Sequence, residues 1–153
     1  MSHTPTFDLT TAHKFFSADN FNKTWEFIDK NERSMDDNLN MLHTAMASLW
    51  HWSQREDATE ENLSVGYWQV SRVFCLLGQT DLARTYGRMS LKHAEALVPF
   101  FKGYACEALA RAEMLAHNRV IMLEYLNRAR ELANQVKDEE NRQILLNDLE
   151  TIQ

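Results

Sequence analysis

The chain is poor in the residues that interrupt helices and in positive charge. Its 153 residues include only four glycines and two prolines. Strand-like alternation of apolar and polar residues is absent, and no apolar run approaches the roughly 18 residues that a membrane helix requires. The net charge of −6 disfavours binding to nucleic acid or to an anionic membrane surface, because both need clustered Lys and Arg. We therefore expect neither kind of partner.

Cysteine is also scarce, and the two thiols show no ligand spacing. Cys75 and Cys106 lie in separate apolar stretches without a CxxC motif. This usage is typical of buried free thiols in a reducing compartment. Residues 1–16 lack a basic segment followed by an apolar stretch, so we expect no signal peptide. A cytoplasmic location is the default prediction.

The motifs of common enzymes and metal sites are missing as well. The sequence has no HExxH motif, nucleophile elbow or glycine-rich phosphate loop. His43 and His51 are eight residues apart, about 12 Å along a helix, which is too far to share one metal ion. Glu113 and His117 are four residues apart, whereas the pairs of di-iron bundles are three apart. We predict no catalytic residue, no metal site and no cofactor.

What the sequence does contain is apolar residues at spacings of three and four, which predict helices. Gly78 is expected to close one helix and Pro99 to begin another, while Ser34 and Thr80 are candidate N-caps. The connections are short, which favours antiparallel hairpins in a single domain over residues 1–153. We expect about seven helices, over residues 9–30, 35–54, 60–77, 81–97, 99–117, 119–136 and 138–151.

A weak internal repeat becomes visible when the chain is shifted by 39 residues. The shift superposes VSRVFCLLGQTDLARTYGRMSLKHA on LARAEMLAHNRVIMLEYLNRARELA. Few residues are identical, but residue sizes agree: Ser71 aligns with Ala110, and Ser90 aligns with Ala129. Small residues at matching places allow the two helices of a hairpin to approach closely.

With these features, residues 73–97 (VFCLLGQTDLARTYGRMSLKHAEAL) resemble one tetratricopeptide repeat (TPR), with a leucine–glycine turn and the small residues Ala83 and Ser90. Residues 104–136 resemble a second repeat, in which Met122 replaces a small residue and Glu113 an aromatic one. The chain is also similar to small bacterial TPR-like proteins without an assigned activity.

The resemblance implies an all-α fold, in which antiparallel helical hairpins stack as a short right-handed superhelix. The repeat-like hairpins would lie at about 9–54, 60–97 and 99–136, with a capping helix at 138–151. It also implies a non-catalytic scaffold that binds a protein or peptide in a concave groove, which the first helix of each hairpin lines.

Helical wheels place candidate binding residues on two of these first helices. Trp68 and Arg72 lie opposite the apolar stripe of helix 60–77, and Tyr104, Glu107 and Arg111 lie opposite that of helix 99–117. Arginine offers a planar fork to a carboxylate or phosphate, and tryptophan offers a flat apolar platform. The stripes predicted to be core are Leu63, Gly66, Tyr67, Val70, Val73, Phe74 and Leu77 on the first helix, and Ala105, Leu109, Ala112 and Ala116 on the second.

Simpler interpretations of this face remain open. Glu107 and Arg111 are four residues apart, so they can form an ordinary exposed ion pair on one helix. Trp68 can instead pack under the N-terminal helix. The alternative function is a small-molecule sensor with an aromatic-lined pocket, and an enzyme is the third hypothesis. The apolar stripe of helix 138–151 can also form a homodimer seam.

Residues 43–54 (HTAMASLWHWSQ) contain two histidines and two tryptophans. Trp50 and Trp52 lie on opposite borders of the apolar stripe of their helix, so we expect each to seal a different helix contact. His51 lies on the polar side and is retained as a minor candidate for partner binding. The core stripe predicted for this helix is Met35, Leu39, Leu42, Met46 and Leu49.

Overall fold

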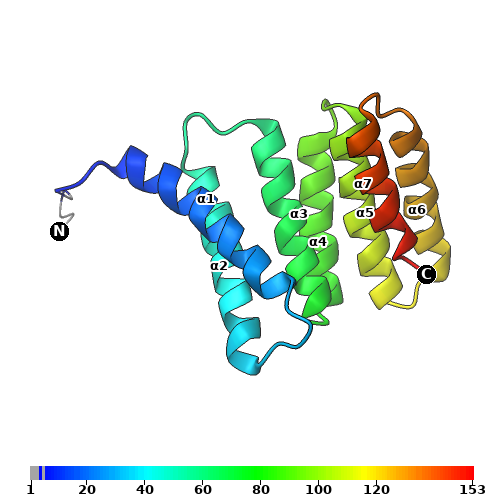
Figure 1. Cartoon of the computed structure of the whole chain (residues 1–153), viewed down its shortest axis with the longest axis horizontal. Coiled ribbons are helices and arrows are strands. Elements are labelled where there is room, and N and C mark those ends of the chain that lie inside the picture. Colours follow the sequence, from blue (N-terminus) through cyan, green and yellow to red (C-terminus); the bar gives the residue numbers. More distant parts are fainter. Residues whose placement is uncertain (1–3, 5) are drawn as a thin grey trace. The chain divides into compact units, whose positions relative to one another are not determined.

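The computed structural model describes Thr4 and residues 6–153, and the helices that it contains match the expected all-α class (Figure 1). Part of the N-terminal stretch for which no signal peptide is expected thus lies outside the described residues. No described residue belongs to a strand, and each helix ends within three residues of its predicted bounds. The helices are α1 (Leu9–Ile28), α2 (Met35–Ser53), α3 (Glu60–Leu76), α4 (Thr80–Ala94), α5 (Pro99–Leu115), α6 (Arg119–Asn134) and α7 (Glu139–Glu150).

Most predicted helix ends are confirmed. Ser34 caps α2 in a capping box, because its hydroxyl accepts from the amide of Asp37 while the Asp37 carboxylate accepts from the amide of Ser34. Pro99 occupies the first turn of α5. Gly78 follows α3 with a φ of +71°, the left-handed conformation that glycine tolerates. The prediction for Thr80 is wrong: this residue is already helical, and the N-cap position belongs to Gln79.

The described chain divides into two compact units, residues 1–59 and 60–153. The boundary coincides with the junction between the first and second predicted hairpins. The prediction of one domain over the whole chain stays a prediction, as does membership of the TPR family. No helix among the described residues has the length and apolar character needed to cross a membrane.

The first unit is the antiparallel hairpin of α1 and α2, joined through small and polar residues. The hydroxyl of Ser48 donates to the carbonyl of Ser17 at 2.7 Å, and that of Thr24 to Thr44 Oγ1 at 2.9 Å. The predicted core stripe of α2 is therefore mostly wrong. Met35, Leu39 and Met46 are exposed, Leu42 is half-buried, and the residues that α2 buries are Met41, Ala45, Ser48 and Leu49.

The physical reason for this correction is the small size of the buried residues. Small side chains let α1 and α2 approach closely along the face that bears Ala45 and Ser48, and hydroxyl hydrogen bonds offset the cost of burying polar groups there. Hydrophobicity alone favoured the stripe with the larger side chains, which lies partly in solvent.

The second unit contains the hairpins α3–α4 and α5–α6, with α4 packed against α5 and α7 against both α5 and α6 (Figure 1). The small residues that the repeat aligned are buried, as predicted: Ser71, Ser90, Ala110 and Ala129 are each at most 1% exposed. The core stripes predicted for α3 and α5 are also largely confirmed. Gly66, Val70, Val73, Phe74, Ala105, Leu109 and Ala112 are buried, whereas Leu63, Tyr67, Leu77 and Ala116 are half-buried.

Two glycines permit close helix packing in this unit. A Cβ atom at Gly87 of α4 would lie 2.9 Å from Leu109 Cδ2, and one at Gly103 of α5 would lie 2.6 Å from Leu145 Cδ2. Leu109 and Leu145 are almost fully buried. These contacts hold α4 and α7 close against α5, the helix that carries most of the candidate site.

Candidate functional site

The centre of the predicted binding face is a buried carboxylate shared by two helices. The indole N–H of Trp68 on α3 donates to Glu107 Oε2 on α5 at 2.8 Å, and Arg111 Nε donates to Glu107 Oε1. Glu107 is 1% exposed and Arg111 is 7% exposed. The expectation that Glu107 faces an open groove is therefore wrong, and so is the alternative of an exposed ion pair: the pair forms, but inside the protein.

Helix α7 completes this network through residues that the sequence analysis did not single out. The Tyr104 hydroxyl donates to Asp148 Oδ2 at 2.6 Å. Arg111 Nη2 donates to the backbone carbonyl of Asp148 at 2.9 Å and to Thr151 Oγ1 at 2.6 Å. Burial, followed by the hydrogen bond to Asp148, raises the pKa of Tyr104. The network thus fixes Trp68 and Tyr104 in place, and no local sequence signal links them to α7.

An apolar pocket of about 240 Å³ lies beside Trp68 and Tyr104. Its aromatic walls meet edge to face, with ring centroids 5.5 Å apart for Trp68 and Tyr104 and 5.1 Å apart for Phe100 and Tyr104. Two serines in the wall satisfy one another, because each hydroxyl donates to the other residue's carbonyl, at 3.0 and 2.9 Å. We call this the aromatic pocket; it is lined by Ser64, Val65, Trp68, Ser90, Phe100, Phe101 and Tyr104.

A second cavity, of about 330 Å³, lies beside Arg72 and Arg111. Arg72 is half-buried, and no other described residue forms a hydrogen bond or ion pair with it. Burial and the nearby charge of Arg111 lower the pKa of Arg72. Burial also raises the pKa of the Cys75 thiol to about 11. We call this the arginine cavity; it is lined by Arg72, Cys75, Leu76, Arg111, Met114, Leu115 and His117.

The remaining predicted site residue, His51, belongs to the first unit. Its Nδ1 atom lies 2.8 Å from Nδ1 of His13 on α1, so one imidazole donates and the other accepts. Burial, followed by the charge of His13, lowers the pKa of His51. Trp50 is 56% exposed and its ring centroid lies 5.5 Å from that of His13 on α1, so it covers this helix contact only in part. Trp52 is half-buried and stacks under the guanidinium of Arg55, 3.9 Å from the ring centroid.

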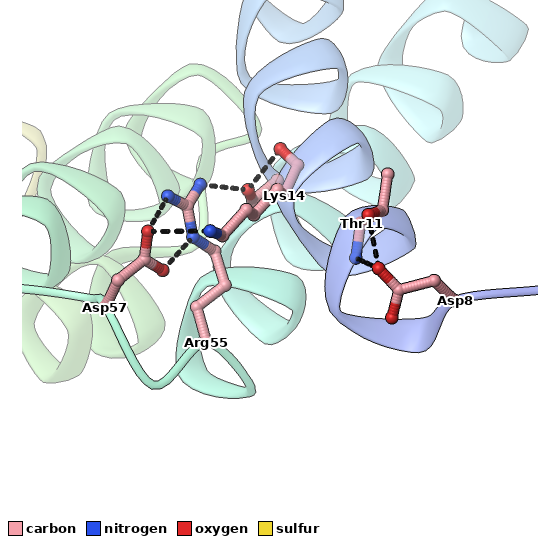
Figure 2. Close-up of polar contacts among 6 residues, drawn as sticks. Asp8, Thr11, Lys14, Arg55 and Asp57 are labelled. Atoms are coloured by element: carbon pink, nitrogen blue, oxygen red, sulfur yellow. Dashed lines mark hydrogen bonds and ion pairs between the residues drawn. The ribbon is translucent and has the colours of Figure 1, made fainter.

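Arg55 also organises a polar cluster at one end of the first unit, which the sequence analysis missed (Figure 2). Its guanidinium donates to both oxygens of Asp57, at 2.8 and 2.9 Å, and to Ser17 Oγ at 3.0 Å. Lys14 lies 3.6 Å from the same carboxylate. The bonds from Arg55 lower the pKa of Asp57 to about 2. These charges are satisfied by one another, which favours a structural role.

The other residues that could have formed a metal site make structural contacts or lie apart. Glu113, which was considered with His117 as a metal pair, accepts from Arg84 Nε at 2.7 Å and from Arg84 Nη2 at 2.9 Å. These bonds to α4 lower the pKa of Glu113. Among the described residues, no three His, Cys, Asp or Glu side chains are grouped so that they could hold a metal ion. Both cysteines are free thiols; Cys106 is buried and Cys75 half-buried.

The fold and this site define an all-α protein built from helical hairpins, with an aromatic pocket and an arginine cavity in its second unit. Comparisons with protein-family models, curated proteins and solved structures found no match.

Proposed function

We propose that the protein is a non-catalytic, TPR-like scaffold that binds a peptide or protein through the α3–α5 face of its second unit. The observation that carries the proposal is the aromatic pocket, an apolar cavity whose walls include Trp68 and Tyr104. Large aromatic side chains around an apolar cavity are typical of the anchor points that dominate binding energy at interfaces.

The hydrogen bonds that hold the walls of the aromatic pocket also support a binding function. Glu107 holds the Trp68 indole, and Asp148 holds the Tyr104 hydroxyl. Because these rings are already fixed, a partner loses little binding energy to ordering them. The buried ion pair of Glu107 and Arg111 thus acts from beneath the surface as a support for the aromatic walls.

The size of the aromatic pocket favours a side chain over a complete small molecule. Its volume of about 240 Å³ is below the range of roughly 300–1,000 Å³ that small-molecule sites usually occupy. Small-molecule binding remains the second candidate function, because the apolar walls would suit an aromatic compound. An enzyme would need convergent titratable groups, and Tyr104 is the only lining residue of the pocket with an ionisable side chain.

The cytoplasm is the compartment that we propose. The two free cysteines support it, since thiols persist in a reducing environment.

Filling the aromatic pocket tests the proposed function. A random peptide library displayed on phage is selected against the full chain, and a fluorescein-labelled copy of the selected peptide is then titrated by fluorescence polarisation. Val65→Trp places a large ring in the pocket and should weaken binding about tenfold or more. Val120→Trp on α6 is the matched control, because Val120 is 69% exposed and lines neither the aromatic pocket nor the arginine cavity.

The unfolding transition of both variants shows whether they remain folded. Equal affinity of the folded Val65→Trp and Val120→Trp proteins for the peptide would contradict the proposal. If the library yields no binder while a neutral aromatic compound binds wild type and not Val65→Trp, the second candidate function is correct instead.

A further inference from the structure

The aromatic pocket and the arginine cavity open on the same face of the second unit. On α3, Trp68 lines the first and Arg72 lines the second, four residues later. On α5, Tyr104 lines the first and Arg111 the second, seven residues later. Residues at spacings of four and seven share one face of a helix. A single extended ligand along α3 and α5 can therefore reach both cavities.

The arginine cavity contains a positive charge, that of Arg72, which no hydrogen-bonded carboxylate in the described part of the chain neutralises. Glu107 uses both carboxylate oxygens, one for Arg111 and one for the indole of Trp68. Asp148 accepts a hydrogen bond from the Tyr104 hydroxyl, and its backbone carbonyl accepts one from Arg111. Arg72 is thus a half-buried cation without a hydrogen-bonded counter-ion among the described residues. Partly buried charges of this kind are stabilised by an anionic partner.

We propose that this face recognises an extended peptide that carries an apolar side chain and a carboxylate side chain three to five residues apart. The apolar side chain enters the aromatic pocket, and the carboxylate binds Arg72 in the arginine cavity. This inference rests on the proposed function, and it adds the chemistry and the spacing of the ligand.

The spacing follows from helix geometry. Val65, which lines the aromatic pocket, and Arg72, which binds the carboxylate, are separated by about 10 Å along α3, at about 1.5 Å per residue. On α5, Phe101 of the aromatic pocket and Arg111 of the arginine cavity are about 15 Å apart by the same rise. An extended peptide advances about 3.3 Å per residue, so three to five residues span these distances. A carboxylate suits Arg72 because a guanidinium presents two parallel N–H donors to its two oxygens.

A set of synthetic peptides tests the spacing and the charge. Each fluorescein-labelled peptide has a glycine–serine backbone with one Phe and one Glu, which are placed one to eight residues apart. Affinity for the full chain is measured by fluorescence polarisation at one fixed ionic strength. Binding should be tightest at spacings of three to five, and replacing the Glu of the best peptide by Gln should weaken it about tenfold or more.

Matched variants assign the charge preference to Arg72. In Arg72→Gln, the preference for the Glu peptide over the Gln peptide should disappear. Arg130→Gln removes the same charge from an exposed position on α6 and should keep that preference. Val65→Trp should weaken both peptides, because both use the aromatic pocket.

The outcomes separate this inference from the proposed function. Suppose that Val65→Trp weakens binding while Arg72→Gln keeps the full preference for Glu. The aromatic pocket is then correct as the binding site of the apolar side chain, and the contact of the carboxylate with Arg72 is wrong. If neither variant changes binding, both proposals are wrong. Absence of an optimum in spacing, or lack of binding by every peptide of the set, also overturns the inference. So does a free arylalkanoic acid that binds as tightly as the best peptide, because the occupant is then a small acid.

Discussion

At the scale of single residues, Glu107 is the most informative position in the protein. Glu107 precedes Arg111 by four residues, a spacing that is common for exposed ion pairs on helix surfaces. Glu107 is nevertheless almost fully buried. Its environment is created by Trp68 from α3 and by the α7 residues that hold Arg111. The role of this carboxylate therefore depends on side chains that are distant in sequence.

Removing the charge of Glu107 should destabilise the protein strongly. In Glu107→Gln, the amide can still accept from Trp68, but Arg111 is left as a buried cation without a counter-ion. Breaking a buried pair in this way costs roughly 3 kcal/mol of unfolding free energy. Urea denaturation measures the loss, and Glu139→Gln, in the exposed pair with Arg142, is the control and should change little. Equal effects of the two substitutions would mean that the buried pair contributes no more than a surface pair.

At the scale of elements, local chemistry decides where most helices begin and end. The capping box of Ser34 and the ring of Pro99 act within one helical turn, so short stretches of sequence are sufficient to predict them. Thr80 shows the limit, because its neighbour Gln79 takes the N-cap position without any side-chain hydrogen bond.

Gly78 gives a test of the local contribution to stability. Its φ is +71°, and no atom lies within 4 Å of the place that a Cβ would occupy at this position. Gly78→Ala should therefore lower the unfolding free energy by about 1–2 kcal/mol through backbone strain alone. Asparagine tolerates the left-handed conformation better, so Gly78→Asn should lose less. Urea denaturation of both variants compares the losses; an alanine variant as stable as wild type would show that the turn adopts another conformation at no cost.

The stability of the hairpin of α1 and α2 should respond to pH through His51. The pKa of His51 in the folded protein lies below its ordinary value of 6.5. The unfolded chain then binds more protons in the window just below pH 6.5, so stability rises with pH across that window. The contribution is fully present above pH 6.5 and is lost as the pH falls through the folded pKa of His51.

Urea denaturation between about pH 5 and 8 checks this sign, since histidine titrates in that interval. His51→Gln should flatten the dependence of stability on pH. Asn40→Gln changes an exposed side chain of the same helix that has no titratable group, and it should leave the dependence unchanged. A wild-type protein that becomes more stable as the pH falls from 7 to 5 would contradict the prediction.

At the scale of the whole molecule, the chain consists of two compact units with different kinds of core. The first unit is built on the hairpin of α1 and α2, whose helices contact each other through small and hydroxyl-bearing side chains. Residues 60–153 surround a larger apolar cluster, in which α5, α6 and α7 bury Cys106, Leu126, Leu145 and Leu149. The Glu107 network and both cavities lie wholly within the second unit.

The second unit should therefore fold on its own. A fragment of residues 60–153 contains all the partners of Glu107 and both cavities, so we expect cooperative thermal unfolding by circular dichroism. A fragment of residues 1–59 is close to the size at which a single core is marginal, and we expect a broad transition. Absence of a cooperative transition in the 60–153 fragment would show that this unit needs the first hairpin.

The sequence by itself determined the helices and most of their ends, because these follow from interactions within a few turns of one helix. It also indicated the buried small residues of the second unit, because their sizes repeat at matching positions of two hairpins. It also placed Trp68 and Glu107 among the candidate binding residues, and the structure joins them by a hydrogen bond. Only the tertiary structure decided that Glu107 and Arg111 are buried, that α7 closes over them and that an aromatic pocket forms beside them. The physical reason is that α5 is covered on several sides by α3, α4, α6 and α7. A periodic pattern marks one apolar face, whereas the burial of a polar side chain depends on donors and acceptors that distant helices supply.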